Sequence, residues 1–459
     1  MMLMAWLLGG LAVPWLAAYA LVRRCDADAP GDAATLWLHG LLAFGLALGL
    51  ASCSYFIGLF LCGAPGRGFC WVESTALASL GLVLWLAPGR RTPRRTIVSA
   101  PPYGTLLRLV FLAALISALL GIAGMFAVEP YGDWDAWNIW TMRARFLFRS
   151  GPAWRNAFAP IFAHPDYPLL LSGAIARSWT WLGGEQARIP QFLAAAFTLL
   201  GAGLLTAGVA RLRGSNQGWL AGLSLLGTVF YLVRGASMYA DVPLSFYFLA
   251  AILLLALYDA GRHSAPGLLV LAGLAAGLAA WTKNEGILFL AVTLFVRTGL
   301  AWRRAGGRGA LREAGALLAG AAPVVAVVVL FKVAVTAEND LAAGQSWHTL
   351  LPRLTDVSRS VFILKSFLGS LWHVGKALVV ILPLACLLAG GAPDRRRGLL
   401  PGLAGILGAM LIGYFFVYLA TPNDLKWHVP TSIDRLLIQL WPSMLLAAFL
   451  YLGDPTTRA

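Results

Sequence analysis

The residues best suited to chemistry are carboxylates in short polar segments that separate long apolar ones. In the first such segment Asp133 and Asp135 stand two residues apart among three tryptophans. A carboxylate at a membrane boundary is partly desolvated, and desolvation raises its pKa and makes it a better proton acceptor. Anchoring at the membrane interface explains the tryptophans, but it does not require the aspartates. The segment therefore predicts a general base, and either aspartate can fill that role.

Four later segments also place polar side chains at the edge of an apolar stretch. Asp166 either caps the helix that follows it or lines a site. Asp241 stands where the chain enters lipid, which is costly for a carboxylate without a role. Lys283 and Glu285 share a tight turn, so the lysine either pairs with its neighbour or points at a phosphate. Arg435 either forks onto a phosphate or carboxylate, or extends along the membrane surface to water.

The elements that must position these residues are membrane helices. The chain has 459 residues, of which 59% are hydrophobic and 12% charged, whereas a soluble domain carries roughly 25% charged residues. Apolar stretches such as Leu399–Ala420 are each long enough to span about 30 Å of hydrocarbon as a helix. This composition excludes a conventional cytosolic enzyme, a disordered scaffold and a disulfide-stapled secreted module. It predicts an all-α fold, a polytopic transmembrane helical bundle.

The net charge of +15 marks one side of the membrane and not a nucleic-acid surface. Arginines gather in clusters between the apolar stretches, and such clusters mark cytoplasmic loops. The clusters are Arg23 and Arg24, Arg90 to Arg95, Arg211 and Arg213, Arg262, Arg303 to Arg312, and Arg395 to Arg397. Counting the apolar stretches between them predicts about thirteen spans, with the N-terminus outside and the C-terminus inside. A composition rich in arginine, alanine, glycine and leucine favours a bacterial inner membrane.

The predicted spans leave long loops on the outer side. The spans are 3–22, 36–62, 69–88, 106–128, 188–210, 218–236, 242–258, 266–282, 286–302, 314–336, 374–391, 399–420 and 434–452. The apolar stretch 168–185 does not fit this alternation, so it is predicted as a re-entrant or interfacial helix on the outer face. Thr141–Arg149 has the pattern of a short amphipathic helix. The first outer loop, 129–187, is therefore expected to carry amphipathic juxtamembrane helices, and further outer loops are expected at 337–373 and 421–433.

In their order and on their common side, these motifs resemble the C-type glycosyltransferases (the GT-C fold). The branch they resemble contains the protein O-mannosyltransferases and the aminoarabinose transferases. Asp133-Trp134-Asp135 is similar to the acidic motif that opens that family's first periplasmic loop, although the family's acidic pair is usually adjacent. The segments that match the family's remaining motifs are 164–169, 183–185, 188–190, 239–244, 282–283 and 434–437.

The resemblance implies transfer of a sugar from a polyprenyl-phosphate donor to a glycan, lipid or protein acceptor on the outer face. Asp135, with Asp133 as its rival, is expected to deprotonate the acceptor for a direct displacement that inverts the anomeric carbon. Asp241 is expected to orient the acceptor or to complete the phosphate site. The cations expected at the donor phosphate are Lys283 and Arg435, followed by Arg143 and Arg145. The side chains expected to line the acceptor side are His164, Asp166, Tyr167, Tyr239, Glu285 and His428.

Cofactor and domain predictions follow from the same comparison. An Asp-x-Asp pair holds a divalent cation in other glycosyltransferases, so a divalent cation is left open, although no dedicated metal-ligand spacing is present. Because the resemblance begins at the fourth span, residues 1–105 are predicted as a three-span N-terminal addition. Residues 106–310 are predicted as the GT-C-like catalytic core and 311–459 as C-terminal spans.

A polytopic transporter or lipid flippase is the alternative function. Transporters carry ionisable groups near the middle of the membrane and broken helices in paired halves. Here the carboxylates gather at one boundary, and the charges that interrupt apolar stretches, Lys332 and Asp259, are expected to extend to water. Access from both faces would favour transport. A single outward-facing cavity floored by Asp133, Asp135 and Asp241 would favour the transferase.

Overall fold

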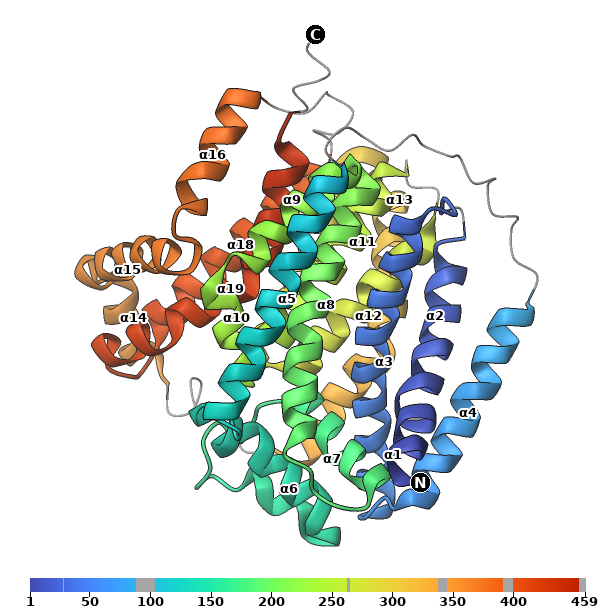
Figure 1. Ribbon diagram of the computed structural model, residues 1–459. Helices are drawn as coiled ribbons and strands as arrows, with labels where there is room; N and C mark the ends of the chain where they lie inside the picture. The colour runs from blue at the N-terminus through green and yellow to red at the C-terminus, as the bar shows by residue number, and fades with distance from the viewer. Residues whose placement is uncertain (28, 88–103, 262–264, 337–344, 391–398, 454–459) are drawn as a thin grey trace.

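The computed structural model describes residues 1–27, 29–87, 104–261, 265–336, 345–390 and 399–453, and every regular element in these ranges is a helix (Figure 1). Nine of the described helices are long and apolar enough to cross a membrane, or up to eleven if each bent pair counts as one span. The architecture is that of a helical multi-pass membrane protein. The arginine clusters at 90–95, 262 and 395–397, and the start of the predicted loop 337–373, lie outside the described residues.

The N-terminal helices pack into the same core as later ones. The first span joins α1 (Met2–Ala5), η1 (Trp6–Ala12) and α2 (Val13–Cys25), and it is followed by α3 (Ala33–Cys62) and α4 (Arg67–Leu86). Asp32 caps α3 by accepting a hydrogen bond from the Thr35 amide at 2.8 Å. α3 contacts α2 on one side and α7, α8 and α12 on the other. Part of the segment predicted as an addition is therefore built into the bundle.

A group of short helices connects the next two spans. The elements are α5 (Gly104–Val128), η2 (Ala136–Trp140), α6 (Thr141–Arg149), η3 (Gly151–Phe158), α7 (Leu170–Leu182) and α8 (Arg188–Arg213). The amphipathic helix predicted at 141–149 coincides with α6. Most of α7 is buried, and it packs on α3 and α6. We call the end of the bundle that carries these short helices the α6–α7 end (Figure 1).

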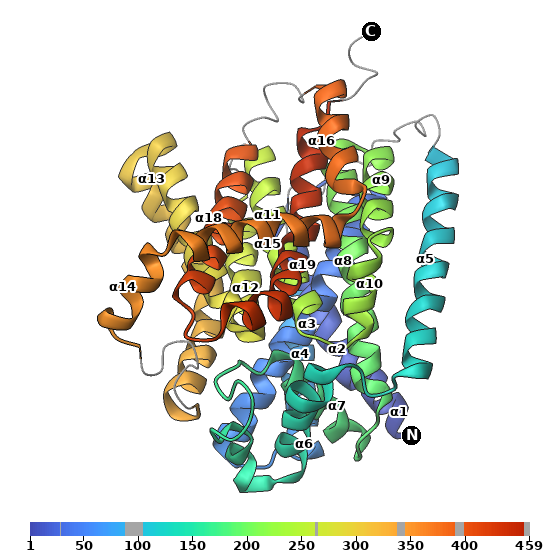
Figure 2. The ribbon, with the colours of Figure 1, turned by 90° about the vertical axis from the view of Figure 1, so that its left-hand side faces the viewer.

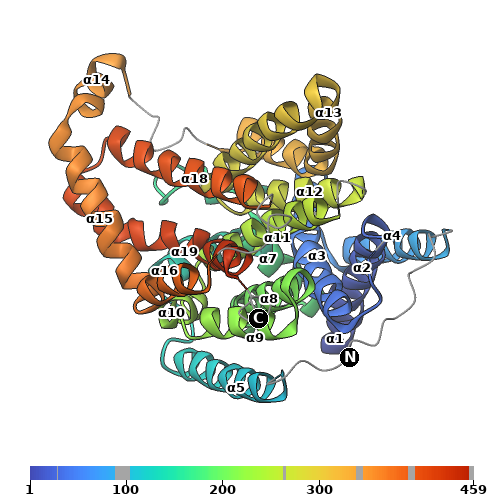
Figure 3. The same ribbon diagram turned by 90° about the horizontal axis from the view of Figure 1, so that it is seen from above.

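Helix α11 lies at the centre of the bundle. It runs from Asp241 to Ala260, and its whole apolar window is buried. A helix that is apolar all round is expected to be enclosed by others. Figure 3 shows α8, α12 and α19 around it, and all three contact it. Before α11, α9 (Ser215–Leu226) and α10 (Val229–Ala236) form a pair bent by 62°.

Helices α12 (Pro266–Thr282) and α13 (Asn284–Ala334) approach each other through glycines. A Cβ atom on Gly273 would lie 1.9 Å from the carbonyl oxygen of Leu317. One on Gly320 would lie 1.8 Å from the carbonyl oxygen of Val270. Small residues let membrane helices pack backbone to backbone in this way. Beside the turn between α12 and α13, which carries Lys283, a Cβ atom on Gly286 would lie 1.9 Å from the carbonyl oxygen of Ala279, so the two backbones are also closely packed there.

The C-terminal part contains two helices that begin in the predicted outer loop 337–373, and the second of them ends two residues beyond it. These are α14 (Trp347–Thr355) and α15 (Val357–Gly375), and α15 meets α16 (Leu378–Ala389) at an angle of 87° (Figure 2). The chain then forms α18 (Leu400–Ala420) and α19 (Leu425–Tyr451). α19 packs against α8, α11, α15 and α18, so it ties the C-terminal part to the central helix.

The count of nine to eleven candidate spans is lower than the predicted thirteen because it includes α13 once and leaves out the short helix α12. The stretches 286–302 and 314–336 fall on either side of Gly306, which has φ +67° and marks a break between two helical segments of α13, so the predicted separation coincides with a break in the helix. The stretch 218–236 is the bent pair α9–α10, and 266–282 is α12, which has 17 residues. The number of crossings therefore stays a prediction beyond the nine to eleven counted among the described helices.

Candidate functional site

Five charged side chains from distant parts of the chain meet toward the α6–α7 end, and we call them the ion cluster: Asp135, Asp241, Lys283, Glu285 and Arg435. Asp135 precedes η2, and Asp241 is the first residue of α11, where the helix dipole favours a carboxylate. Lys283 lies in extended backbone between α12 and α13. Glu285 is in the first turn of α13, and Arg435 projects from α19.

Asp241 is the centre of the cluster. It is fully buried, and its Oδ1 accepts hydrogen bonds from Lys283 Nζ at 2.9 Å and from Gln439 Nε2 at 2.7 Å. Its Oδ2 accepts one from Arg435 Nε at 2.9 Å. A buried carboxylate is stable only when it is paired and hydrogen-bonded, and here both oxygens are used. Asp241 therefore holds the two cations at a fixed separation.

Arg435 connects Asp241 to Asp135. Its Nη2 donates to Asp135 Oδ2 at 2.5 Å, and its guanidinium lies 4.6 Å from the centre of the Tyr239 ring. Asp135 is 5% exposed. Burial, followed by the nearby Asp135, raises the pKa of the Tyr239 phenol, so this ring stays neutral beneath the guanidinium. The guanidinium of Arg435 thus bridges the carboxylates of Asp135 and Asp241 and lies over the Tyr239 ring.

The neighbouring Asp133 takes no part in the cluster. Its side chain is 46% exposed, its Oδ1 accepts from the amide of Trp134 at 2.7 Å, and its Oδ2 lies 3.6 Å from Arg234 Nη1. Asp133 and Asp135 thus engage different arginines. The described residues contain no group of three or more His, Cys, Asp or Glu side chains placed to hold a metal ion. A divalent cation shared by this pair remains a prediction from the resemblance.

Lys283 lies between two carboxylates and an aromatic ring. Besides Asp241, its Nζ contacts Glu285 Oε1 at 2.8 Å, and it lies 5.5 Å from the centre of the Tyr167 ring. Burial alone would lower the pKa of the Lys283 ammonium, but the charges of Asp241 and Glu285 outweigh it and hold the pKa above its ordinary value. Lys283 is therefore charged. Lys283 pairs with Glu285 in its own turn, as one alternative expected, and a role at a donor phosphate stays a prediction.

A second polar group adjoins the ion cluster through Asn284. Asn284 Nδ2 donates to Asp166 Oδ2 at 2.8 Å, while Lys332 Nζ donates to the same oxygen at 3.0 Å and to Asn284 Oδ1 at 2.8 Å. Asp166 does not cap α7, which begins after Leu169 without a side-chain cap. The expectation that Lys332 extends to water is wrong, because its ammonium is satisfied by these partners.

The other predicted residues are placed differently. Arg143 is fully buried and donates to the carbonyl oxygens of Ala163, at 2.8 Å, and of His164, so it braces the loop before α7. Arg145 faces Glu185 at 3.4 Å with its side chain 39% exposed. The structure therefore brings together two of the four cations expected at the donor phosphate, Lys283 and Arg435.

The predicted residues His164 and Tyr167 lie beside the cluster, whereas His428 makes its contacts elsewhere. The His164 ring stacks on Tyr167 at 4.5 Å, and Tyr167 lies beside Lys283. His428 Nδ1 lies 3.0 Å from Thr421 Oγ1, and its ring meets the edge of Tyr418. His164 and Tyr167 are thus connected to the cluster through Lys283, whereas His428 belongs to the start of α19.

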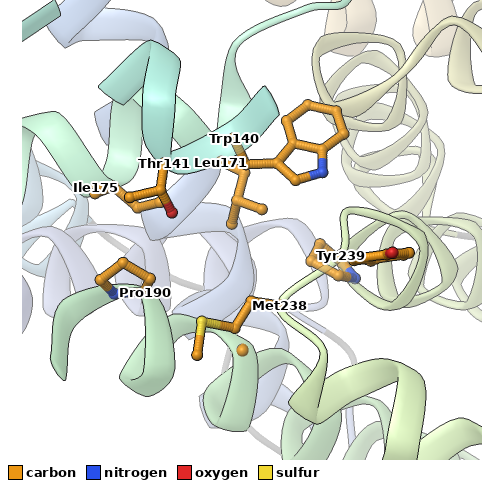
Figure 4. A pocket seen from close by; sticks show the side chains of 9 residues that line it. Trp140, Thr141, Leu171, Ile175, Pro190, Met238 and Tyr239 are labelled. Atoms are coloured by element: carbon orange, nitrogen blue, oxygen red, sulfur yellow. The ribbon is translucent and has the colours of Figure 1, made fainter. Parts of the chain in front are cut away.

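Behind Tyr239 the packing leaves only a small void of about 10 Å³ (Figure 4). Its wall includes Trp140, Leu171, Pro190, Met238 and Tyr239. A void of this size holds about one water molecule. The Tyr239 turn is therefore supported from behind by close apolar packing, which keeps the ring in place under Arg435.

Gln439 was not singled out by its sequence position, yet it completes the cluster. Its Nε2 donates to Asp241 and also to Glu285 Oε1 at 3.2 Å, and its Oε1 accepts from the Tyr414 hydroxyl at 2.7 Å. Gln439 lies four residues after Arg435 in α19, so both side chains lie on one face of the helix. The sequence signal that could have identified Gln439 is a polar residue one helical turn after Arg435, inside an otherwise apolar stretch.

No protein-family model matches the chain, and comparison with the curated proteins and with solved structures finds no match either. The function therefore has to be inferred from the arrangement of the side chains themselves.

Proposed function

We propose that the protein is a membrane glycosyltransferase that moves a sugar from a polyprenyl-phosphate donor to a glycan, lipid or protein acceptor. In this proposal it resides in a bacterial inner membrane with the α6–α7 end facing the periplasm. The observation that supports it best is the union of Asp135, Asp241, Lys283 and Arg435 through hydrogen bonds of 2.5 to 2.9 Å. These residues come from separate motifs, and Arg435 and Asp135 lie 300 positions apart. The site joins a candidate base to the cations that a leaving phosphate needs.

The charges of the ion cluster suggest how the donor enters. Three carboxylates face two cations, so the cluster carries one net negative charge, and both cations are already paired. A donor phosphate therefore has to replace a carboxylate. Asp241 is held by three donors, whereas Asp135 is held in the cluster by Arg435. The phosphate is expected to take the Nη2 side of the Arg435 fork and to release Asp135.

The released Asp135 then acts as the base. It takes the proton from an acceptor hydroxyl while the acceptor oxygen bonds to the anomeric carbon. The bond from that carbon to the phosphate oxygen breaks, and polyprenyl phosphate leaves with the electron pair. Lys283 and Arg435 stabilise the charge that develops on the leaving oxygen. One displacement inverts the anomeric carbon, and donor binding precedes activation of the base.

The test compares two neighbouring aspartates that differ in their place in the structure. Purified protein in lipid nanodiscs is supplied with a panel of polyprenyl-phosphate hexoses and pentoses plus membrane extract as acceptor, and released polyprenyl phosphate is measured. Asp135→Asn is expected to slow transfer by about 100-fold or more, the usual effect of losing a general base. Asp133→Asn, the matched control, is expected to stay within a few-fold of wild type.

Two results would contradict the proposal. Near-normal transfer by Asp135→Asn would show that Asp135 is not the general base. Absence of sugar transfer from every donor, together with movement of the labelled lipid between leaflets of sealed vesicles, would favour the flippase instead.

A further inference from the structure

A large cavity lies at the opposite end of the bundle from the ion cluster. Its volume is about 920 Å³, and the end of α2, the start of α3, the end of α4 and the start of α12 line it. α12 begins at Pro266 in this wall and ends at Thr282 beside Lys283. Its 17 residues separate the two places by about 25 Å along the helix axis. The cavity is therefore distinct from the site described above.

The wall of the cavity is rich in arginine. Arg23, Arg24 and Arg312 line it, and the Arg23 guanidinium lies 4.8 Å from the centre of the Trp85 ring. Arg24 Nη1 donates to the carbonyl oxygen of Ala87 at 3.2 Å. Arg23 and Arg312 are both exposed, and they come from α2 and α13. Guanidinium groups from separate helices can converge on one anion.

The only carboxylate among the described lining residues, Asp26, is already paired. It is 5% exposed and accepts hydrogen bonds from both terminal nitrogens of Arg211 and from His39 at 2.9 Å. Burial would raise the pKa of Asp26, but these hydrogen bonds lower it to about 2, so the carboxylate stays charged and bound to Arg211. Asp26 therefore does not neutralise the arginines of the wall.

The rest of the wall is aromatic or aliphatic. Tyr19, Leu36, Leu84 and Trp85 line the cavity beside the arginines. Leu36 is 51% and Trp85 55% exposed. Leu36 lies at the start of α3 and Trp85 near the end of α4. The first span, which ends with α2, and the helices α3 and α4 are long enough to cross a membrane, and α2 and α4 run side by side away from the α6–α7 end (Figure 1). A ligand that matches this wall has an anionic head and an apolar tail.

We propose that this cavity binds the phosphate headgroup of an anionic membrane lipid. Arg23 and Arg312 contact the phosphate, and Leu36 and Trp85 contact the start of the lipid tail. Basic pockets between membrane helices bind such headgroups because the guanidinium fork matches phosphate oxygens and the tail stays in the bilayer. The site does not depend on the proposed transferase activity.

The test uses the full-length protein in a neutral detergent. Phosphatidylglycerol is titrated in, and bound lipid is counted by native mass spectrometry, with phosphatidylcholine and inorganic phosphate as the other ligands. The variant Arg23→Gln/Arg312→Gln is compared with Arg303→Gln/Arg308→Gln. The second variant removes the same charge from exposed positions of α13 that do not line the cavity.

Phosphatidylglycerol is expected to bind at least tenfold more tightly than phosphatidylcholine. The cavity variant is expected to lose that preference, and the α13 variant to keep it. Leu36→Trp, which fills the cavity without changing charge, is expected to weaken the lipid as well and provides the test if the double variant does not fold. Equal binding by the cavity variant and the α13 variant would overturn the proposal. So would inorganic phosphate binding as tightly as the lipid, because the site would then recognise a soluble anion.

Discussion

Helix α11 begins in one buried ion network and ends in another, and the two differ in composition. At its end, Arg297 pairs with Asp259 at 2.6 Å and with Glu313 at 3.1 Å, and Arg304 pairs with the same two carboxylates. We call these four residues the Arg297 network. It has two cations and two carboxylates from two helices, α11 and α13. The ion cluster around Asp241 has an extra carboxylate and draws on several elements.

The difference between the two networks suggests different roles: the Arg297 network holds two helices together, and the ion cluster holds a reactive group. A balanced network within two helices satisfies every charge and leaves nothing to exchange. The ion cluster has one more carboxylate than cations, its Asp135 comes from the segment between α5 and α6, and two aromatic rings flank its cations. Buried charges are costly, so an unbalanced group is a candidate for function. We therefore expect parallel substitutions at the two ends to have different consequences.

The largest difference is expected for the two aspartates of α11. Asp241→Ala leaves Lys283 and Arg435 without their shared partner, which costs about 3–5 kcal/mol of folding free energy, and it should slow transfer by about 100-fold or more per folded molecule. Asp259→Ala should also lower the unfolding temperature, yet leave transfer per folded molecule unchanged. Thermal unfolding in detergent and the transfer assay measure the two effects. Equal losses of transfer in both variants would erase the distinction between the networks.

A smaller difference is expected when arginine is replaced by lysine. Arg435→Lys keeps the charge but cannot reach Asp135 and Asp241 with separate nitrogens, so it should raise the KM for the donor by about tenfold, or about 1.4 kcal/mol. Arg304→Lys, in a partly exposed position of the Arg297 network, should leave that KM within twofold. Steady-state kinetics with varied donor provide the measurement. An unchanged KM in Arg435→Lys would show that donor binding does not depend on the two separate nitrogens of the Arg435 guanidinium.

The smallest difference concerns the aromatic rings under the arginines. Tyr239 lies 4.6 Å from Arg435, and Tyr258 lies 5.4 Å from Arg297. A cation–π contact contributes about 0.5–2 kcal/mol, so Tyr239→Leu should weaken donor binding by about twofold to thirtyfold. Tyr258→Leu should affect the unfolding temperature alone. If both variants bind donor like wild type, the ring supports the fold and not the site.

Much of the helical architecture could be predicted from the sequence because it depends on residues that are close together in the chain. Apolar stretches fix where helices run, and the amphipathic period of 141–149 gave α6 at its observed bounds. The break at Gly306 falls in the arginine cluster that separates the predicted stretches 286–302 and 314–336. The bend between α9 and α10 was not predicted, because both halves are apolar and no proline or charge run separates them.

The ion cluster was predictable in part, for a physical reason. Asp241, Lys283 and Arg435 stand at the edges of apolar stretches, where a charge without a partner is costly. Their pairing was beyond sequence reasoning because it joins positions up to 300 residues apart. Arg143 illustrates the same limit: it was expected at a phosphate, but backbone carbonyls in its own loop take its hydrogen bonds.

The most direct measurement of the central claim is donor binding by Asp135→Asn. If the donor phosphate replaces Asp135 at Arg435, removing that negative charge should let the variant bind a polyprenyl-phosphate sugar at least as tightly as wild type, while single-turnover transfer falls by about 100-fold or more. Binding is followed by the change in unfolding temperature with added donor. Weaker donor binding by the variant, or transfer at the wild-type rate, would contradict the account.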